Sequence, residues 1–331
     1  MADLQAAKAL VLAANAALDR AGPGEVVAAL EPFVAPDLLW RGMYPFHTQT
    51  GAAAMAELFW RPLKDAMGPL RRRPDIFFAG QNVLDGPASV WVVEMGHLMG
   101  TWDAPWIGLQ PSRKLAFLRF CDFHRIEGDR IVETASYVDI LNLLAQSGRH
   151  PQAGTTGSVL LTPGPATHDG LLHGPHPEAE GRATIGLVSD MVADLRANKV
   201  GSPEDHMARF WTPDMCWFGP GGIGASAFFD GYRRGHSGPF EDGLDYVRHT
   251  EHVTRVGEGN YGGFFGYPSL TVRSKGGFMG LPGSDVAADM RIVDLYRRDG
   301  DRLAENWIFI DIPHFMAMQG VDILAELGQD T

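Results

Sequence analysis

The stretch LRFCDFHRIEGDRIVETASYVDILNLLAQSG, residues 118–148, recurs in altered form at residues 290–320 as MRIVDLYRRDGDRLAENWIFIDIPHFMAMQG. The two segments align without a gap, and eleven of the 31 positions are identical. Residues 10–42 align in the same way with residues 187–219, with ten identities in 33 positions. Matches of this length at nearly constant offset indicate that the chain is an internal duplication.

The duplication predicts two similar domains, residues 1–146 and residues 179–331, joined by a linker at residues 147–178. The linker is rich in Gly, Pro, Ser, Thr and His, and it has no amphipathic period. A chain of 331 residues has the length expected of two domains, and each half is long enough to bury a core of its own.

Each half has the same order of predicted elements, with helices first and long strands after them. The predicted helices are residues 4–19, 25–33 and 51–67 in the first half and 179–198, 203–211 and 225–235 in the second. The predicted strands of the first half are residues 76–84, 88–102, 114–126 and 130–141, with a tight Glu-Gly-Asp turn between the last two. This order predicts an α+β fold, in which helices pack on one face of a curved antiparallel sheet. We therefore expect two tandem cone-shaped α+β barrels, each with a ligand cavity at its open mouth.

Composition and charge restrict the partners of the chain. The formal net charge is −12 and the pI about 5.4, so the surface is expected to repel nucleic-acid phosphates and anionic membranes. No apolar run approaches the ~18 residues of a membrane span. The two cysteines, Cys121 and Cys216, are too few for a disulfide framework, and the first helix is amphipathic rather than a signal sequence. We expect a cytoplasmic protein that binds neither nucleic acid nor membranes.

Several short motifs resemble those of the SnoaL-like polyketide cyclase family, which lies within the NTF2-like superfamily. They are RPDI at residues 73–76, WIGLQPS at 106–112, HRIEGDRIVE at 124–133 and DILNLLAQSG at 139–148. The second half repeats part of this set, with FMGLPGS at residues 278–284, RRDGDRLAE at 297–305, Asn306-Trp307 and Asp311. The resemblance covers most of both halves but not the linker, and it implies an NTF2-like fold for each half.

The resemblance also implies which residues carry chemistry. The family's general acid/base is the aspartate at the position of Asp139, and its repeat mate in the second half is Asp311. The family pairs this aspartate with a histidine near the position of His124, where the second half has Tyr296. An apolar cavity raises the pKa of a carboxyl group by desolvation, which suits it to proton transfer near neutral pH. The alternative interpretation is a carboxylate that caps a strand end or pairs with an arginine.

Further side chains are candidates for the wall of a binding cavity. Tyr137 lies on the predicted strand face of Asp139, and His97 lies on an apolar strand face. The candidate substrate-binding residues are Trp40, Tyr44, His47, His97, Tyr137, Trp217 and Trp307. For Trp40, Trp217 and His97, the alternative interpretation is packing within the core.

No sequence motif supports nucleophilic, metal or nucleotide chemistry. The chain has no Gly-x-Ser-x-Gly elbow, no HExxH and no Cys/His cluster, and the Gly-rich run at residues 219–224 lacks the Lys-Ser/Thr of a P-loop. We expect no metal ion and no organic cofactor. The favoured function is acid/base catalysis on a small apolar carbonyl compound, by resemblance a cyclase or isomerase. A non-catalytic ligand-binding protein and a structural or partner-binding module are the alternatives.

Two further expectations concern how the halves work together. The duplication and the long linker predict that the domains pack sheet against sheet as an intramolecular pseudo-dimer, and they leave further homo-oligomerisation open. The first half holds both Asp139 and His124, so we expect it to carry more of any catalysis. In the second half the place of His124 is taken by Tyr296, which is a hydrogen-bond donor rather than a proton shuttle at neutral pH.

Overall fold

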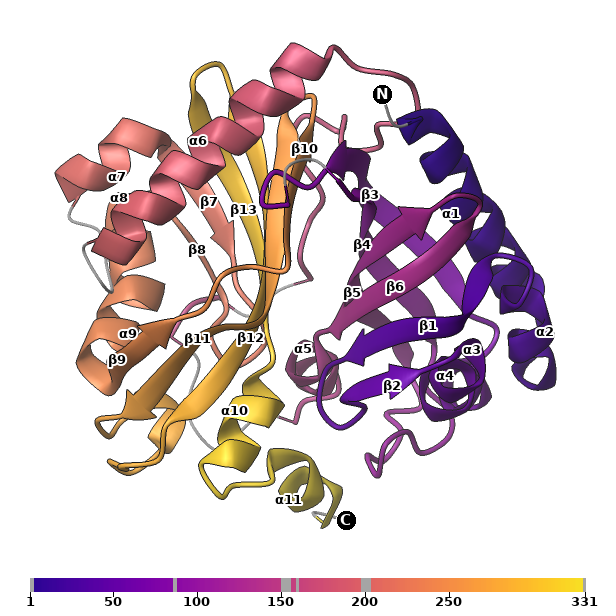
Figure 1. Cartoon of the computed structure of the whole chain (residues 1–331). Helices are drawn as coiled ribbons and strands as arrows, with labels where there is room; N and C mark the ends of the chain where they lie inside the picture. Colours follow the sequence, from indigo (N-terminus) through magenta and orange to yellow (C-terminus); the bar gives the residue numbers. More distant parts are fainter. Residues whose placement is uncertain (1–2, 86–87, 150–155, 159–160, 198–203, 330–331) are drawn as a thin grey trace. The chain divides into compact units, whose positions relative to one another are not determined.

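The computed structural model describes residues 3–85, 88–149, 156–158, 161–197 and 204–329 (Figure 1). By its contacts the chain divides into two compact units. Unit 1 consists of residues 1–138, 163–175 and 322–331, and unit 2 consists of residues 139–162 and 176–321. Each unit contains one sheet with its own covering helices, so the predicted fold class of two tandem α+β domains is confirmed.

The sheet of unit 1 has six strands in the order β2-β1-β6-β5-β4-β3. The strands are β1 (Val34–Gly42), β2 (Thr48–Thr50), β3 (Arg71–Gln81), β4 (Val90–Thr101), β5 (Leu115–Glu127) and β6 (Arg130–Val138). Strands β3 to β6 form an antiparallel meander, and β1 joins β6 in parallel. The β5–β6 hairpin turns at Gly128, whose φ of 60° lies in the left-handed region that glycine adopts without strain.

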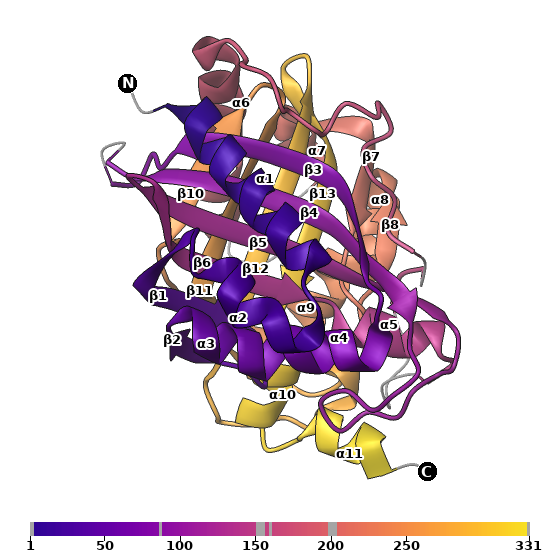
Figure 2. The ribbon, with the colours of Figure 1, turned by 90° about the vertical axis from the view of Figure 1, so that its right-hand side faces the viewer.

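Helices precede the long strands of unit 1, as the sequence predicts. They are α1 (Leu4–Arg20), α2 (Val26–Leu30), α3 (Ala52–Met55), the π-helical turn Ala56–Trp60 and α4 (Arg61–Met67), with a 3-10 turn at Pro23–Glu25 and α11 (Ile323–Gln329) near the chain end. The Asp3 carboxylate starts α1 by accepting hydrogen bonds from the backbone N–H groups of Gln5 and Ala6. Helix α1 lies across β3 and β4, as Figure 2 shows. Its buried residues Ala7, Val11, Ala14 and Leu18 recur at helical spacing along one side.

Part of the predicted linker extends the sheet of unit 1. Within residues 163–175, Gly170 O accepts a hydrogen bond from the Phe77 N–H at 2.8 Å, and the Leu172 N–H donates to Phe77 O at 2.8 Å. The buried Lys8 donates from Nζ to Leu172 O at 2.7 Å. The segment therefore covers an edge of β3 that would otherwise present unpaired backbone groups.

The sheet of unit 2 repeats this plan with one strand divided in two. Its order is β10-β11-β12-β13-β7-β8, and β9 pairs with the other end of β11. The strands are β7 (Trp211–Phe218), β8 (Ala225–Ala227), β9 (Leu244–His249), β10 (Thr254–Glu258), β11 (Tyr261–Ser274), β12 (Ala288–Asp299) and β13 (Arg302–Ile310). Together β9 and β10 occupy the place that β3 alone has in unit 1.

Helices also cover the sheet of unit 2. They are α5 (Ile140–Gln146), α6 (Glu178–Ala197), α7 (Glu204–Phe210), α8 (Phe228–Tyr232), the π-helical turn Arg233–Ser237, α9 (Gly238–Gly243) and α10 (Ile312–Met318), with a 3-10 turn at Phe278–Gly280. Figure 1 shows α6 crossing this sheet, and its contacts are mainly with β10 and β11. None of the helices in the described residues is long and apolar enough to cross a membrane.

The last strand of the first half is shorter than the sequence pattern predicts. The pattern predicts a strand at residues 130–141, but β6 ends at Val138 and α5 follows. The reason is Asp139, whose Oδ1 accepts a hydrogen bond from the Asn142 N–H at 3.0 Å and so caps the helix. Asp139 consequently does not share a strand face with other side chains.

Candidate functional site

Unit 2 encloses a cavity of about 160 Å³ between its sheet and the covering helices. Many of the side chains that line it are apolar or aromatic, among them Met191, Val192, Trp211, Trp217, Phe240, Phe264 and Ile292. Three buried polar side chains from the neighbouring strands β12 and β13 meet in the same cavity: Asp294, Tyr296 and Asn306. An apolar cavity with convergent polar groups is the arrangement expected of a small-molecule site.

Asp294 is the buried acidic group of this cluster, with 7 % of its surface exposed. Its Oδ1 accepts a hydrogen bond from Asn306 Nδ2 at 3.0 Å, and the Tyr296 side chain also hydrogen-bonds to it. Burial raises the pKa of Asp294 to about 7, although both hydrogen bonds act to lower it. The carboxyl group is therefore divided between its two protonation states near neutral pH, as a general acid or base needs to be.

Two histidines line the same cavity in uncharged form. His236, in the π-helical turn, stacks on Trp217 with ring centroids 4.0 Å apart, and its buried Nδ1 has no hydrogen-bond partner within the described part of the chain. His252 stacks on Phe264 with ring centroids 3.8 Å apart. Burial lowers the pKa of each imidazole to about 3, so both rings are uncharged at neutral pH.

The corresponding cavity of unit 1 measures about 30 Å³, which is room for about one water molecule. Asp122 on β5, the repeat mate of Asp294, lines it together with His124 and Thr134. Burial raises the pKa of Asp122 to about 7 and lowers the pKa of His124 to about 3. His124 Nδ1 lies 3.0 Å from Thr134 Oγ1. Unit 1 thus has a similar carboxyl group with almost no space beside it.

One helical position contributes directly to this difference in volume. The π-helical turns Ala56–Trp60 and Arg233–Ser237 have the same length, and each precedes a short helix that has proline near its start. Their last residues are Trp60 and Ser237, and both side chains line the cavity of their own unit. The indole of Trp60 therefore fills space that the small Ser237 side chain leaves open.

The strand next to the aspartate differs as well. Asp122 is paired across the ladder with Glu94, whereas Asp294 is paired with Phe264. Glu94 forms an ion pair at 3.3 Å with the buried guanidinium of Arg72. The two side chains of this ion pair stay together, because separating two buried charges costs free energy. Unit 1 is consequently filled by side chains that cannot easily move aside for a ligand.

The two aspartates predicted as general acid/bases lie at helix starts in unit 2, and neither lines either of these cavities. Besides capping α5, the Asp139 carboxylate accepts a backbone hydrogen bond from Gly221 at 3.0 Å. Asp311, which is completely buried, accepts from the His314 N–H at 3.2 Å and forms an ion pair with Arg291 at 3.3 Å. Both carboxylates have structural partners, and their catalytic role stays a prediction.

Two of the remaining predicted site residues line a cavity. His124 contributes to the small cavity of unit 1, and Trp217 contributes to the larger cavity of unit 2. The cores of the two units hold three other predicted residues, each with 0 % of its surface exposed: Trp40, Tyr137 and Trp307. They pack within the cores of their units, and their role in substrate binding stays a prediction.

The last three predicted residues have local partners in unit 1. His97 Nδ1 lies 3.2 Å from Asp75 Oδ2, and the Tyr44 hydroxyl donates to Asp322 Oδ2 at 2.9 Å. His47 is exposed beside Tyr44, with ring centroids 5.5 Å apart. None of these side chains is among those that line the two cavities, so a role in substrate binding stays a prediction.

Sequence reasoning did not select Asp122 or Asp294 as site residues, although a signal for them exists. The aspartate is identical in the two repeats, and Asp122 lies in phase with His124 on the same strand. A buried acidic residue in the middle of an apolar strand is usually paired or functional, because burying a lone charge costs free energy. His236 and His252 carry no comparable signal, because their places depend on a π-helical turn and on a break between strands.

A larger hollow of unit 2, about 480 Å³, is a weaker candidate. It is lined mainly by glycine-rich loops, including Gly222, Gly276 and Gly280, and its one titratable residue, Asp242, is exposed. Within the described ranges of the chain, no group of three or more His, Cys, Asp or Glu side chains is arranged to hold a metal ion. The candidate site is therefore the cavity that contains Asp294.

Solved structures show partial likenesses to this chain. An NTF2-like protein from Burkholderia thailandensis is 22 % identical over 45 % of this chain and 99 % of its own, with a TM-score of 0.33. A candidate polyketide cyclase from Xanthomonas campestris pv. campestris is 21 % identical over 44 % of this chain and 99 % of its own, with a TM-score of 0.35. A protein with a ketosteroid isomerase-like fold from Catenulispora acidiphila is 20 % identical over 42 % of this chain and 92 % of its own, with a TM-score of 0.27.

No family model and no curated protein matches the chain. The kinds of protein that the sequence motifs resemble, NTF2-like proteins and polyketide cyclases, are present among the matched structures. Each of these matches spans less than half of the chain. At such identities and TM-scores the likenesses say nothing about activity.

Proposed function

We propose that unit 2 binds a small, largely apolar carbonyl compound in its cavity and transfers a proton with Asp294. One observation carries the proposal: a buried carboxyl group with a pKa of about 7 lies in a largely apolar cavity that has room for a ligand. A perturbed carboxyl group in a cavity is a recognised indicator of a functional site. Unit 1 has a similar carboxyl group without the room, which makes unit 2 the proposed site of activity.

The volume of the cavity limits the part of the ligand that it encloses. A dry protein cavity of about 150 Å³ accepts a molecule of the size of benzene. A cavity of about 160 Å³ therefore suits a single ring with small substituents. Trp217 and Phe264 line the cavity and supply apolar contact area for such a ring.

The chemistry that fits is proton transfer at the carbon next to the carbonyl group. The Asp294 carboxylate takes a proton from that carbon, which leaves an enolate and a neutral carboxylic acid. Returning the proton to a different carbon completes an isomerisation. Alternatively, attack of the enolate on a second carbonyl carbon gives an alkoxide, which takes the proton from Asp294 and so completes an aldol-type ring closure. A base with a pKa of about 7 is half ionised at neutral pH and can act in both directions.

The test uses cyclohex-3-enone, a one-ring ketone whose isomerisation to the conjugated cyclohex-2-enone needs only a proton transfer. We expect the wild-type protein to accelerate the rise in ultraviolet absorbance of the conjugated product and Asp294→Asn to lose this acceleration. In D₂O the wild-type protein should also exchange the protons next to the carbonyl group, as followed by NMR. If the wild-type protein binds the ketone but neither isomerises it nor exchanges its protons, the proposal is contradicted.

A binding protein without catalysis is the second candidate function. It is favoured by the hydrogen bonds that Asp294 already makes with Asn306 and Tyr296, which stabilise the carboxylate in the absence of a ligand. Titration with cyclohex-2-enone, followed by calorimetry, separates the two functions. Binding with no isomerisation and no proton exchange supports the binding protein.

A further inference from the structure

The edge of the unit 2 sheet is interrupted at one point where unit 1 is continuous. In unit 1, β3 remains a single strand that pairs with β4 from Arg71 to Gln81, with only a shift of register between Pro74 and Ile76. In unit 2, residues 250–253 separate β9 from β10, and both strands pair with β11. The interruption is held at both ends, because the Thr250 N–H donates to Ser269 O at 2.8 Å and the Val253 N–H donates to Phe265 O at 2.9 Å. The break is therefore an ordered feature that fixes the position of His252.

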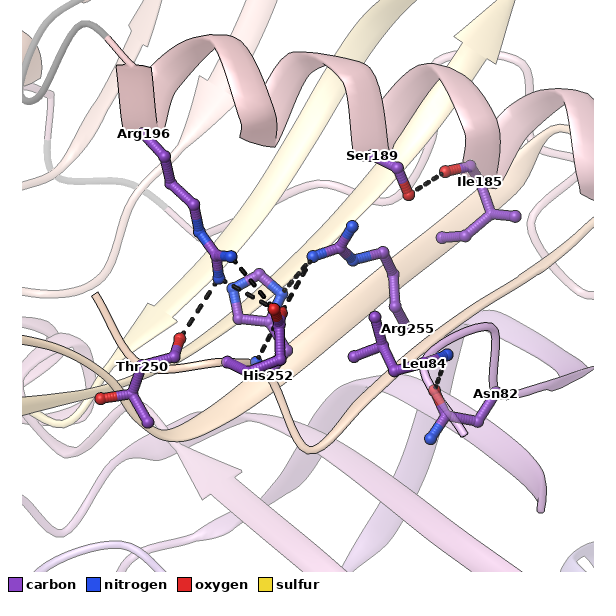
Figure 3. Close-up of polar contacts among 9 residues, drawn as sticks. Asn82, Leu84, Ile185, Ser189, Arg196, Thr250, His252 and Arg255 are labelled. Atoms are coloured by element: carbon purple, nitrogen blue, oxygen red, sulfur yellow. Dashed lines mark hydrogen bonds and ion pairs between the residues drawn. The ribbon is translucent and has the colours of Figure 1, made fainter. Parts of the chain in front are cut away.

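The His252 ring is packed and oriented by its neighbours. It is 8 % exposed, lines the cavity that contains Asp294, and lies nearly parallel to the Phe264 ring, at an interplanar angle of 14°. Nη2 of Arg255 lies 3.3 Å from His252 Nδ1, as Figure 3 shows. The imidazole is thus held on one face by an aromatic ring and on one edge by a guanidinium group.

Arg255 is itself held by a small network of charges. Its Nη2 lies 3.4 Å from Oε1 of Glu251, and the same carboxylate accepts hydrogen bonds at 3.3 Å from Arg196. Arg196 also donates to Thr250 O at 3.2 Å (Figure 3). The guanidinium that contacts His252 is therefore fixed by a carboxylate, and that carboxylate is fixed by a second arginine.

These contacts determine which ring nitrogen of His252 carries the proton. A guanidinium group has only donors, so His252 Nδ1 must be the acceptor in its contact with Arg255. Burial, together with the neighbouring Arg255 and Arg196, lowers the pKa of His252 to about 3, and the ring is neutral at physiological pH. A neutral imidazole whose Nδ1 accepts carries its proton on Nε2. No hydrogen bond to this Nε2 occurs within the described residues.

We propose that the Nε2–H of His252 is the hydrogen-bond donor that anchors the carbonyl oxygen of the ligand in this cavity. The proposal rests on the proposed function, because it assigns a group to the oxygen of the same carbonyl compound. As Asp294 removes the proton from carbon, negative charge develops on that oxygen, and a donor fixed beforehand stabilises it. Arg255 and Glu251 act as positioning residues, since they reach the ligand only through the orientation of His252.

The first experiment compares two substitutions of His252. Phenylalanine keeps a ring that can stack on Phe264 but removes the donor, whereas glutamine restores a donor of similar reach. We expect His252→Phe to lower kcat/KM for cyclohex-3-enone by about 10²–10³-fold, as loss of an oxyanion donor does, and His252→Gln to recover at least part of it. Equal activity of wild type and a folded His252→Phe variant overturns the proposal.

A binding readout separates this proposal from the proposed function. Cyclohex-2-enone labelled with ¹³C at the carbonyl carbon is bound to the Asp294→Asn variant, and hydrogen bonding to the oxygen moves the carbonyl resonance downfield. We expect this shift to disappear in Asp294→Asn/His252→Phe. If the wild type shows no isomerisation but the shift depends on His252, the proposed function fails and the anchor stands. If isomerisation depends on Asp294 but the shift does not depend on His252, the anchor fails alone.

The tautomer is measured directly with ¹⁵N-labelled histidine. We expect the NMR spectrum of the wild-type protein to show His252 with a protonated Nε2 and a bare Nδ1. Replacing Arg255 by methionine removes the donor to Nδ1, so we expect a mixture of tautomers and a lower kcat with little change in KM. A proton on Nδ1 in the wild-type protein overturns the proposal.

Discussion

In both units a buried aspartate stands at the same place in the strand before the last, Asp122 on β5 and Asp294 on β12. Burial raises the pKa of both to about 7. The cavities beside them nevertheless measure about 30 Å³ in unit 1 and about 160 Å³ in unit 2. The raised pKa values have burial as their main cause and do not require a cavity, whereas a site needs space beside the carboxyl group as well.

The difference in space follows in part from an exchanged side chain on a shared backbone plan. Trp60 in unit 1 stands where unit 2 has Ser237, and each of these side chains lines the cavity of its own unit. Close packing makes such exchanges decisive, because interiors leave few voids larger than a water molecule. One copy of a duplicated domain can thus keep a packed core while the other keeps a cavity.

The largest expected effect comes from removing each aspartate in turn. Asparagine has nearly the same shape as aspartate but cannot exchange a proton. We expect Asp294→Asn to lower the rate of cyclohex-3-enone isomerisation by about 10²–10⁴-fold, the usual contribution of a positioned acid or base. Asp122→Asn is the matched control, and we expect its rate to stay close to that of the wild type. A larger loss from Asp122→Asn would assign the activity to unit 1.

The second prediction exchanges the side chains that set the cavity volumes. Trp60→Ser leaves a void in the core of unit 1, and we expect it to lower the free energy of unfolding by about 3–5 kcal/mol, measured by urea denaturation. Ser237→Trp fills the cavity of unit 2, and we expect at least tenfold weaker binding of cyclohex-2-enone by calorimetry. Ser237→Ala is the control that should leave binding nearly unchanged. Unaltered affinity in a folded Ser237→Trp variant would place the ligand elsewhere.

The third prediction concerns pH and applies to both units. A folded-state pKa of about 7 means that native Asp294 and Asp122 keep a proton that the unfolded chain releases above about pH 4. Each carboxyl group therefore lowers the free energy of unfolding as pH rises from about 4 to 7, by up to about 4 kcal/mol. Asn cannot release this proton. We therefore expect the free energy of unfolding of Asp294→Asn and of Asp122→Asn to rise relative to that of the wild type as pH increases from about 4 to 7. Urea unfolding at several pH values measures it, and parallel curves would contradict the raised pKa values.

The smallest expected effects are those of the two capping aspartates. Asp139 accepts hydrogen bonds from the backbone N–H groups of Asn142 and Gly221, which an asparagine oxygen can also accept, so Asp139→Asn should cost about 1 kcal/mol of stability or less. Asp311→Asn should cost more, about 1–3 kcal/mol, because the partly buried Arg291 loses a charged partner. We expect neither change to alter the isomerisation rate. A 10²-fold loss from Asp139→Asn would instead support the role that the family resemblance implies.

Much of the architecture could be predicted from the sequence, because it depends on local patterns. The helix-then-strand order and the hairpin at Gly128 follow from periodicity and from the turn preference of glycine. The end of β6 was less predictable, since residues 139–141 are compatible with a strand. The helix cap at Asp139 decides that point through a side-chain contact with the backbone.

The candidate site was predictable only in part. Trp217 and His124 were selected from the sequence and line cavities, but Asp294, His236 and His252 were not. The resemblance drew attention to Asp139 and Asp311, which the structure places at helix starts. A sequence pattern marks which side chains share a strand face, but it does not show which face borders empty space.

The duplication, the α+β class and the acidic character of the chain follow from the amino-acid sequence alone, because each depends on composition or on contacts between near neighbours. Which copy has a cavity depends on tertiary packing, since the volume is set by side chains from distant segments, such as Val11, Trp60 and Thr134 in unit 1. Tertiary packing also decided the tautomer of His252, which is fixed by Arg255 across a break between strands. Both are properties of packing and desolvation, and these arise only when the segments have come together.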